Sequence, residues 1–189
     1  VMFVEPNGDE LLVIVTVSGP PGSGTSTLVK RIVDEYSWKS LNGGDIFRSE
    51  AQRRGLTVGQ FSVLCKEDLD VDRSLDSILK KELQDTKGSE IIESRLSGWW
   101  AHIMEIDCLR IWVNVSPEEC ARRIQNREGG DFETQLQLSQ QRQMDDKERY
   151  RILYDIDLDD MSPYSLIINA DDINADEVYA LVDTCLRSD

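Results

Sequence analysis

Residues 18–27 hold the groups of this chain that are best placed to do chemistry: Ser-Gly-Pro-Pro-Gly-Ser-Gly-Thr-Ser-Thr. Glycines let the backbone turn tightly and aim successive N–H groups at one point. The apolar run before the segment and the helical pattern after it predict a strand, a turn and a helix, whose dipole favours an anion. We therefore predict a polyphosphate site formed by Gly19, Pro20, Pro21, Gly22, Ser23, Gly24, Thr25, Ser26 and Thr27.

The segment lacks the lysine of the usual phosphate-loop pattern, G-x-x-x-x-G-K-[ST]. Gly19, Gly24 and Ser26 match the pattern, but Thr25 stands at the lysine position. That lysine normally reaches the β- and γ-phosphates, so another cation must do so here. The alternative is a glycine-rich turn that binds no ligand.

Arginines on two consecutive predicted helices can supply the missing charge. Arg123 and Arg127 lie near the end of the first helix, and Arg142, Asp146 and Arg149 fall at i, i+4 and i+7 on one face of the second. The Gly-Gly-Asp segment between them is typical of a hinge. Such a lid can close over a polyphosphate, exclude water and stabilise the transferring group. The alternative is a charged face that is merely solvated.

Two shorter clusters complete the candidate site. Asp45 can cap a helix that carries Arg48, whose guanidinium can form a bidentate fork to a phosphate. Glu93 ends a predicted strand, and Arg95 follows two residues later. Because ligands of parallel sheets lie beyond the carboxyl ends of the strands, Glu93 can face the hydration shell of a metal and Arg95 an anion. An exposed arginine and a plain salt bridge are the competing interpretations.

The order of the predicted elements brings these clusters to one sheet. We expect strands within residues 11–17, 38–41, 89–93, 109–115 and 164–169. Helices are expected near residues 25–36, 45–54, 70–85, 117–127, 134–154 and 176–186, and Gly55-Leu56-Thr57 closes the second of these and caps a further helix. Alternating strands and helices predict a parallel sheet that is covered on both faces. The fold class is therefore a three-layer α/β/α P-loop domain with a central parallel sheet and an arginine-rich helical lid.

The composition excludes several classes of function. Asp and Glu outnumber Lys and Arg by 36 to 21 among 189 residues, a net charge of −15, which repels nucleic acid and anionic membranes. The apolar run at 11–17 is too short to span a bilayer. The four cysteines form no C-x-x-C pair and the single histidine, His102, has none nearby, so no zinc site is indicated. We expect a reduced, cytoplasmic protein, and a salt-rich cytoplasm is one hypothesis for its acidity.

Together, these segments resemble the nucleoside monophosphate kinases, and within them the archaeal-type cytidylate kinases. The resemblance runs from about residue 13 to 186 and rests on 18–27, Gly-Asp-Ile-Phe-Arg (44–48), Glu-Ser-Arg-Leu-Ser-Gly-Trp (93–99), the lid arginines and Tyr-Asp-Ile-Asp (154–157). It implies one domain, 1–189, with a helical monophosphate-binding segment at about 43–86 and a lid at about 123–150. It also implies transfer of the γ-phosphoryl group of Mg²⁺-bound ATP to CMP or dCMP.

The resemblance also implies residue roles. The phosphate loop would bind ATP, Ser26 and Glu93 would serve magnesium, and the catalytic arginines would be Arg123, Arg127 and Arg142. The CMP side would consist of Asp45, Arg48, Arg95, Arg142, Asp146 and Arg149.

Two other functions stay open at this point. Another small-molecule P-loop kinase, acting on AMP, UMP or a sugar acid, would share the loop and the lid. A low-turnover regulatory protein that binds nucleotide would fit the missing lysine. We expect a monomer with small-molecule nucleotides as its partners.

Overall fold

The computed structural model describes residues 13–187, apart from the side chains of Ser62 and Lys66. Leu11 and Leu12 of the first predicted strand, and both ends of the predicted 1–189 domain, lie outside the described residues. In the described part, no helix is long and apolar enough to cross a membrane.

Five strands form one parallel sheet, as predicted. In chain order they are β1 (Val15–Ser18), β2 (Ser40–Asn42), β3 (Ile91–Glu93), β4 (Leu109–Asn114) and β5 (Leu166–Asn169). Their order across the sheet is β2-β3-β1-β4-β5, so β1, which leads into the phosphate loop, lies in the centre. Val17 on β1 is aligned with Glu93 at the end of β3, which brings the two predicted clusters to the same edge of the sheet.

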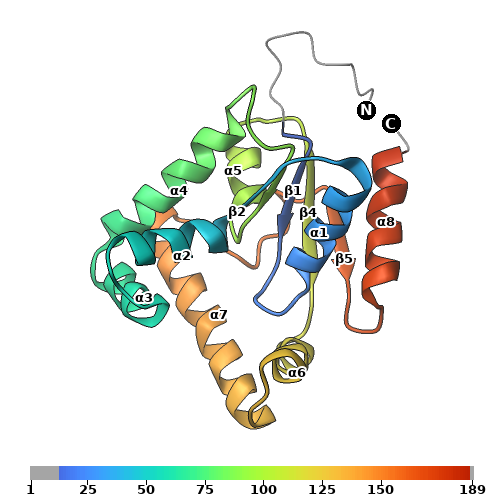
Figure 1. Ribbon diagram of the computed structural model, residues 1–189. Helices are drawn as coiled ribbons and strands as arrows, with labels where there is room; N and C mark the ends of the chain where they lie inside the picture. The colour runs from blue at the N-terminus through green and yellow to red at the C-terminus, as the bar shows by residue number, and fades with distance from the viewer. Residues whose placement is uncertain (1–12, 188–189) are drawn as a thin grey trace.

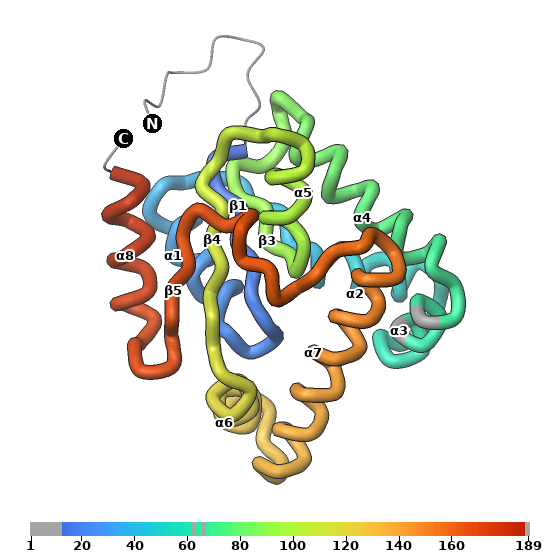
Figure 2. Tube along the Cα trace, turned by 180° about the vertical axis from the view of Figure 1, so that it is seen from behind, coloured from blue at the N-terminus to red at the C-terminus, as the bar shows by residue number. Residues whose placement is uncertain are grey.

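Helices cover both faces, which confirms the three-layer architecture (Figures 1 and 2). Helices α1 and α8 pack together on one face, and α5 covers the other. Helices α6 and α7 pack against each other and project beyond the sheet. The bounds are α1 (Thr25–Tyr36), α2 (Gly43–Arg53), α3 (Val58–Glu67), α4 (Leu69–Leu83), α5 (Ser97–Ile103), α6 (Pro117–Glu128), α7 (Phe132–Tyr154) and α8 (Ala175–Arg187).

Apolar side chains form three clusters that hold these layers. The largest joins the sheet to α1 and α8 through residues such as Val15, Ile32 and Val182, all fully buried. A second joins the other face to α4, α5 and the end of α7, and a third lies among α2, α3 and α4. Burial of continuous apolar strands on both faces is typical of parallel sheets.

Three local predictions need correction. Asp45 does not cap α2, because the Asn42 side chain accepts the Asp45 N–H and Asp45 lies in the first turn. Helix α5 was not predicted, since its seven residues are too few to show a helical period. Strands β1 and β5 are shorter than the apolar runs that predict them.

Candidate active site

The phosphate loop lies between β1 and α1, where the sequence places it. Gly24 has φ +94° and directly precedes α1, a conformation that L side chains rarely adopt. A Cβ on Gly19 would lie 2.8 Å from the Val113 carbonyl oxygen, so at this position the loop passes too close to β4 for a side chain. No side chain at Gly24 caps α1, so the backbone N–H groups at the start of this helix are available to an anion.

Arg123 contacts this loop from helix α6. Its Nη1 donates to the Ser23 carbonyl oxygen at 3.0 Å, its Nη2 donates to the Ala170 carbonyl and its Nε donates to Glu119 at 2.9 Å. A Cβ on Gly24 would lie 3.8 Å from Nη1, so the guanidinium lies beside the loop. This position suits the charge that Thr25 cannot provide.

Ser26 and Glu93 lie side by side at the start of α1 and the end of β3. The Ser26 hydroxyl donates to Glu93 Oε1 at 2.7 Å, and the carboxylate, 7% exposed, also accepts from Asn42 Nδ2. Hydroxyl and carboxylate oxygens are the hard donors that Mg²⁺ prefers, and Mg²⁺ keeps several waters rather than needing an all-protein cage. The donor set therefore fits magnesium. The described residues contain no group of three or more His, Cys, Asp or Glu that could hold a metal.

Asp146 joins two of the predicted acceptor-side arginines. Its Oδ2 accepts Arg95 Nη2 at 2.8 Å and Nε at 3.1 Å, and its Oδ1 accepts Arg149 Nη2 at 2.9 Å. Arg95 also donates from Nη1 to the Gly19 carbonyl oxygen at 2.8 Å, which links α7 to the phosphate loop. Arg95 and Asp146 side chains are each 12% exposed, so the pair is largely desolvated.

The other predicted arginines lie apart from this cluster. Arg48 pairs with Asp45 at 2.6 Å and its side chain is 60% exposed. Arg127 pairs with the neighbouring Glu128 and is 66% exposed. Arg142 is exposed on α7, and no ion pair joins it to another residue of the described part. The roles of Arg48, Arg127 and Arg142 stay predictions, because each side chain would reach the site only when a helix moves or a ligand binds.

Two buried carboxyl groups on α4 were missed. Asp72 Oδ2 lies 3.2 Å from Arg149 Nε, and Asp76 Oδ2 accepts the Tyr154 hydroxyl at 2.6 Å. Burial raises the pKa of both carboxyl groups, that of Asp76 to about 6. Burial opposes the charge of Arg149, but Tyr150, Asp146 and Asp72 together raise its pKa. The spacing of Asp72 and Asp76, i and i+4 on the apolar side of a helix, was the available signal.

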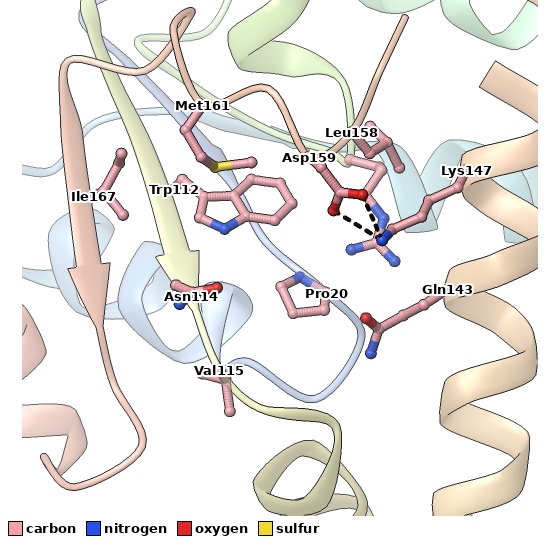
Figure 3. Close-up of a pocket in the computed structure, with 11 residues that line it drawn as sticks. Pro20, Trp112, Asn114, Val115, Gln143, Lys147, Leu158, Asp159, Met161 and Ile167 are labelled. Carbon is pink, nitrogen blue, oxygen red and sulfur yellow. Dashed lines mark hydrogen bonds and ion pairs between the residues drawn. The ribbon is translucent and has the colours of Figure 1, made fainter. Parts of the chain in front are cut away.

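A cavity of about 270 Å³ lies between the phosphate loop, β4, β5 and α7 (Figure 3). Of the predicted site residues, Pro20 and Arg95 line it. The ion pair between Lys147 and Asp159, at 2.8 Å, borders it. Arg95 therefore has the phosphate loop and Asp146 as partners while also lining this cavity. The other lining residues are Trp112, Asn114, Val115, Gln143, Leu158, Met161 and Ile167.

Comparisons with known proteins identify the family. A family model described as an AAA domain matches residues 18–151. The chain is 36% identical to a cytidylate kinase of Archaeoglobus fulgidus over 168 residues, 89% of this chain and 91% of that protein. It is 38% identical to a cytidylate kinase of Haloarcula marismortui over 156 residues, 82% of this chain and 80% of that one.

Solved structures agree on the fold. A shikimate kinase from Bacteroides thetaiotaomicron has a TM-score of 0.57 at 15% identity, over 93% of this chain and 98% of that chain. An uncharacterized protein from Eubacterium ventriosum has a TM-score of 0.70 at 16% identity, over 94% and 99%. The chain, with its phosphate loop, its flanking arginines and its archaeal relatives, belongs to the archaeal-type cytidylate kinase family of nucleoside monophosphate kinases.

Proposed function

We propose that this kinase transfers the γ-phosphoryl group of ATP to CMP, and to dCMP, giving ADP and CDP or dCDP. The observation that carries the proposal is the buried cluster of Arg95, Asp146 and Arg149, hydrogen-bonded to the phosphate loop at Gly19. A second anion site next to a polyphosphate site is what a phosphoryl acceptor requires. The relatives named cytidylate kinase support CMP as that acceptor.

The transfer needs positioning and charge neutralisation more than acid–base chemistry. The monoester phosphate of the acceptor is already mostly ionised at neutral pH, so no general base is required. Ser26 would ligate Mg²⁺ and Glu93 would hold one of its waters, and the bound ion would offset the negative charge of the ATP phosphates. Arg123 beside the loop supplies further positive charge where the loop lysine is absent.

The helical segments have separate proposed roles. Residues 43–86, which include α2, α3 and α4, would form the acceptor side, where Asp45 and Arg48 lie. Residues 123–150 would form the lid, whose turn contains Gly129 and Gly130, both with positive φ. Closing of α6 and α7 would bring Arg127 and Arg142 toward the transferring group.

We propose that Asp146 gives the site its preference for cytosine over uracil. Its Oδ2 already accepts two N–H groups of Arg95, whereas Oδ1 accepts one from Arg149. A carboxylate oxygen has two lone pairs, so Oδ1 keeps one acceptor position for the exocyclic amine of cytosine. Uracil presents a carbonyl at that position and leaves the carboxylate mispaired, which costs about 1–3 kcal/mol.

A coupled assay of ADP release tests the function. With Mg²⁺-ATP fixed, we expect kcat/KM for CMP and dCMP to exceed that for UMP about ten- to a hundredfold. Activity on AMP alone, or on a sugar acid, would assign the chain to another small-molecule kinase. Tight ATP binding with turnover of no acceptor would instead indicate the regulatory alternative.

A further inference from the structure

Asn42 uses both ends of its side-chain amide, and each end reaches a different part of the site. Its Oδ1 accepts the Asp45 N–H at 3.1 Å and so caps helix α2. Its Nδ2 donates to Glu93 Oε2. The orientation of the amide is fixed by this pairing, because the NH₂ group faces a carboxylate and the oxygen faces an N–H.

The carboxylate of Glu93 is thereby held at both oxygens. Ser26 Oγ donates to Oε1 at 2.7 Å while Asn42 occupies Oε2. Because the Ser26 hydroxyl hydrogen is donated in the hydrogen bond to Glu93, the lone pairs of the Ser26 oxygen stay available for a cation. A chain of hydrogen bonds therefore runs from the start of α1, through the end of β3, to the start of α2.

The backbone around Asn42 is shaped to accommodate this arrangement. A Cβ on Gly44 would lie 2.9 Å from Asn42 Oδ1 and 3.3 Å from Arg48 Nη1. A Cβ on Gly43 would lie 2.9 Å from the Ser94 Cβ, directly after Glu93. The two consecutive glycines let the start of α2 approach both the amide and the end of β3.

We propose that Asn42 is a positioning residue that couples the magnesium site to helix α2 on the acceptor side. The inference rests on the proposed function for the roles of Ser26, Glu93 and α2. Asn42 touches neither nucleotide in this scheme. It orients Glu93, and through the cap it ties the start of the Arg48 helix to that carboxylate. Residues that orient a metal-site carboxylate typically change metal affinity 10- to 100-fold when they are replaced.

The test separates this role from ordinary helix capping. Asn42→Ser keeps a good N-cap residue but is too short to reach Glu93. Asn174→Ser is the matched control, because Asn174 Oδ1 accepts the N–H groups of Asp176 and Glu177 in the first turn of α8, outside the acceptor segment and the lid. Binding of ADP is measured by calorimetry with and without Mg²⁺, and CMP binding is measured with and without Mg²⁺-ADP. Thermal unfolding shows that each variant is folded.

We expect Asn42→Ser to lower the Mg²⁺ enhancement of ADP affinity about tenfold and to reduce the effect of Mg²⁺-ADP on CMP affinity. Asn174→Ser should leave both unchanged. A folded Asn42→Ser protein with the wild-type Mg²⁺ enhancement would overturn the proposal.

Gly44→Ala gives an independent test, because it retains Asn42 but displaces its amide, and it should change the Mg²⁺ enhancement in the same direction. It carries the test if Asn42→Ser does not fold, and an unchanged enhancement in folded Gly44→Ala would then overturn the proposal. Wild-type protein that binds Mg²⁺-ADP but not CMP would contradict the proposed function, while the Mg²⁺ comparison would still decide the role of Asn42.

Discussion

Arg95 and Asp146 lie 51 positions apart in the sequence and form an ion pair of 2.8 Å between Nη2 and Oδ2, with both side chains largely buried. The same guanidinium donates to the Gly19 carbonyl oxygen. One arginine therefore connects the end of β3, the phosphate loop and the long helix α7. A shift of α7 changes the surroundings of the loop through this single side chain.

Arg123 and Arg127 should differ in which kinetic constant they control. Arg123 already contacts the loop at Ser23, so Arg123→Ala should raise the KM for ATP and lower kcat. Arg127 is exposed and would reach the site only after the proposed closure of the lid. Arg127→Ala should therefore lower kcat alone, through a loss of ~3–4 kcal/mol of transition-state stabilisation. Steady-state kinetics measure both. Arg122→Ala, also exposed on α6, is the control, and a kcat of Arg127→Ala within a few-fold of wild type contradicts the lid assignment.

Ser26 should control the magnesium requirement. Ser26→Ala removes the hydroxyl that donates to Glu93 and would ligate Mg²⁺. We expect a higher Mg²⁺ concentration at half-maximal rate and a lower kcat, with little change in CMP binding. Ser26→Thr keeps a hydroxyl and should retain most of the activity. An unchanged Mg²⁺ titration in Ser26→Ala would rule out the metal assignment.

Asp146 and Arg149 should separate base choice from phosphate binding. Asp146→Asn replaces an acceptor oxygen that faces the proposed cytosine amine, so the preference for CMP over UMP should fall by roughly tenfold. Arg149→Ala should weaken both pyrimidine nucleotides alike. The kcat/KM values for both nucleotides measure these effects. Equal kcat/KM values for UMP and CMP in the wild-type enzyme would contradict the proposed role of Asp146 in base selection.

Asp76 should make stability depend on pH. Burial raises its pKa to about 6, above the ordinary value of about 3.9 expected for the unfolded chain. The folded state therefore holds this proton more tightly, and the contribution to stability is lost as pH rises from about 4 through 6, by ~3 kcal/mol. Asp76→Asn removes the titrating carboxyl group and with it this loss. The free energy of unfolding of the variant, relative to that of wild type, should therefore increase from pH 4 to pH 7.

Urea unfolding across that pH range measures the difference. Asp70→Asn, at an exposed position of the same helix, controls for the removal of one negative charge. A constant difference between Asp76→Asn and wild type across the range would show that the carboxyl does not titrate there.

Gly98 lies where an added side chain would clash with the ring of Tyr164. A Cβ there would lie 2.3 Å from Cε1 of the buried Tyr164, so Gly98→Ala should lower the free energy of unfolding by ~1–3 kcal/mol. Gly59 is the matched control, since it lies in α3 with nothing within 4 Å of its added Cβ. Gly59→Ala should raise stability by ~0.5–1 kcal/mol. Thermal or urea unfolding distinguishes the two signs.

Much of the fold followed from local patterns. The helix at 25–36 has the predicted bounds, and the five parallel strands lie within or beside the predicted runs. Thr57 caps α3 with a reciprocal bond to Gln60, as a threonine before a helical run predicts. Periodicity and capping are local properties, so one sequence carries them.

The pairing of side chains across the site was less predictable. The sequence places Ser26 and Glu93 at adjoining ends of a strand and a helix, and the structure brings them together. The sequence alone does not show that Asp146 pairs with Arg95, because that contact depends on how far α7 returns toward the sheet. Asn42 was missed for a related reason: its role depends on the register of β2 beside β3.

Under the proposed function, the carboxylates that pair with Arg48, Arg95, Arg123 and Arg149 would also affect how nucleotides bind. Each guanidinium has an acidic counter-ion, so a phosphate that binds there as proposed would replace a carboxylate. Added salt screens the ion pair that breaks as well as the one that forms. Nucleotide affinity should therefore fall less steeply with ionic strength than the number of arginines implies, even in a chain with a net charge of −15.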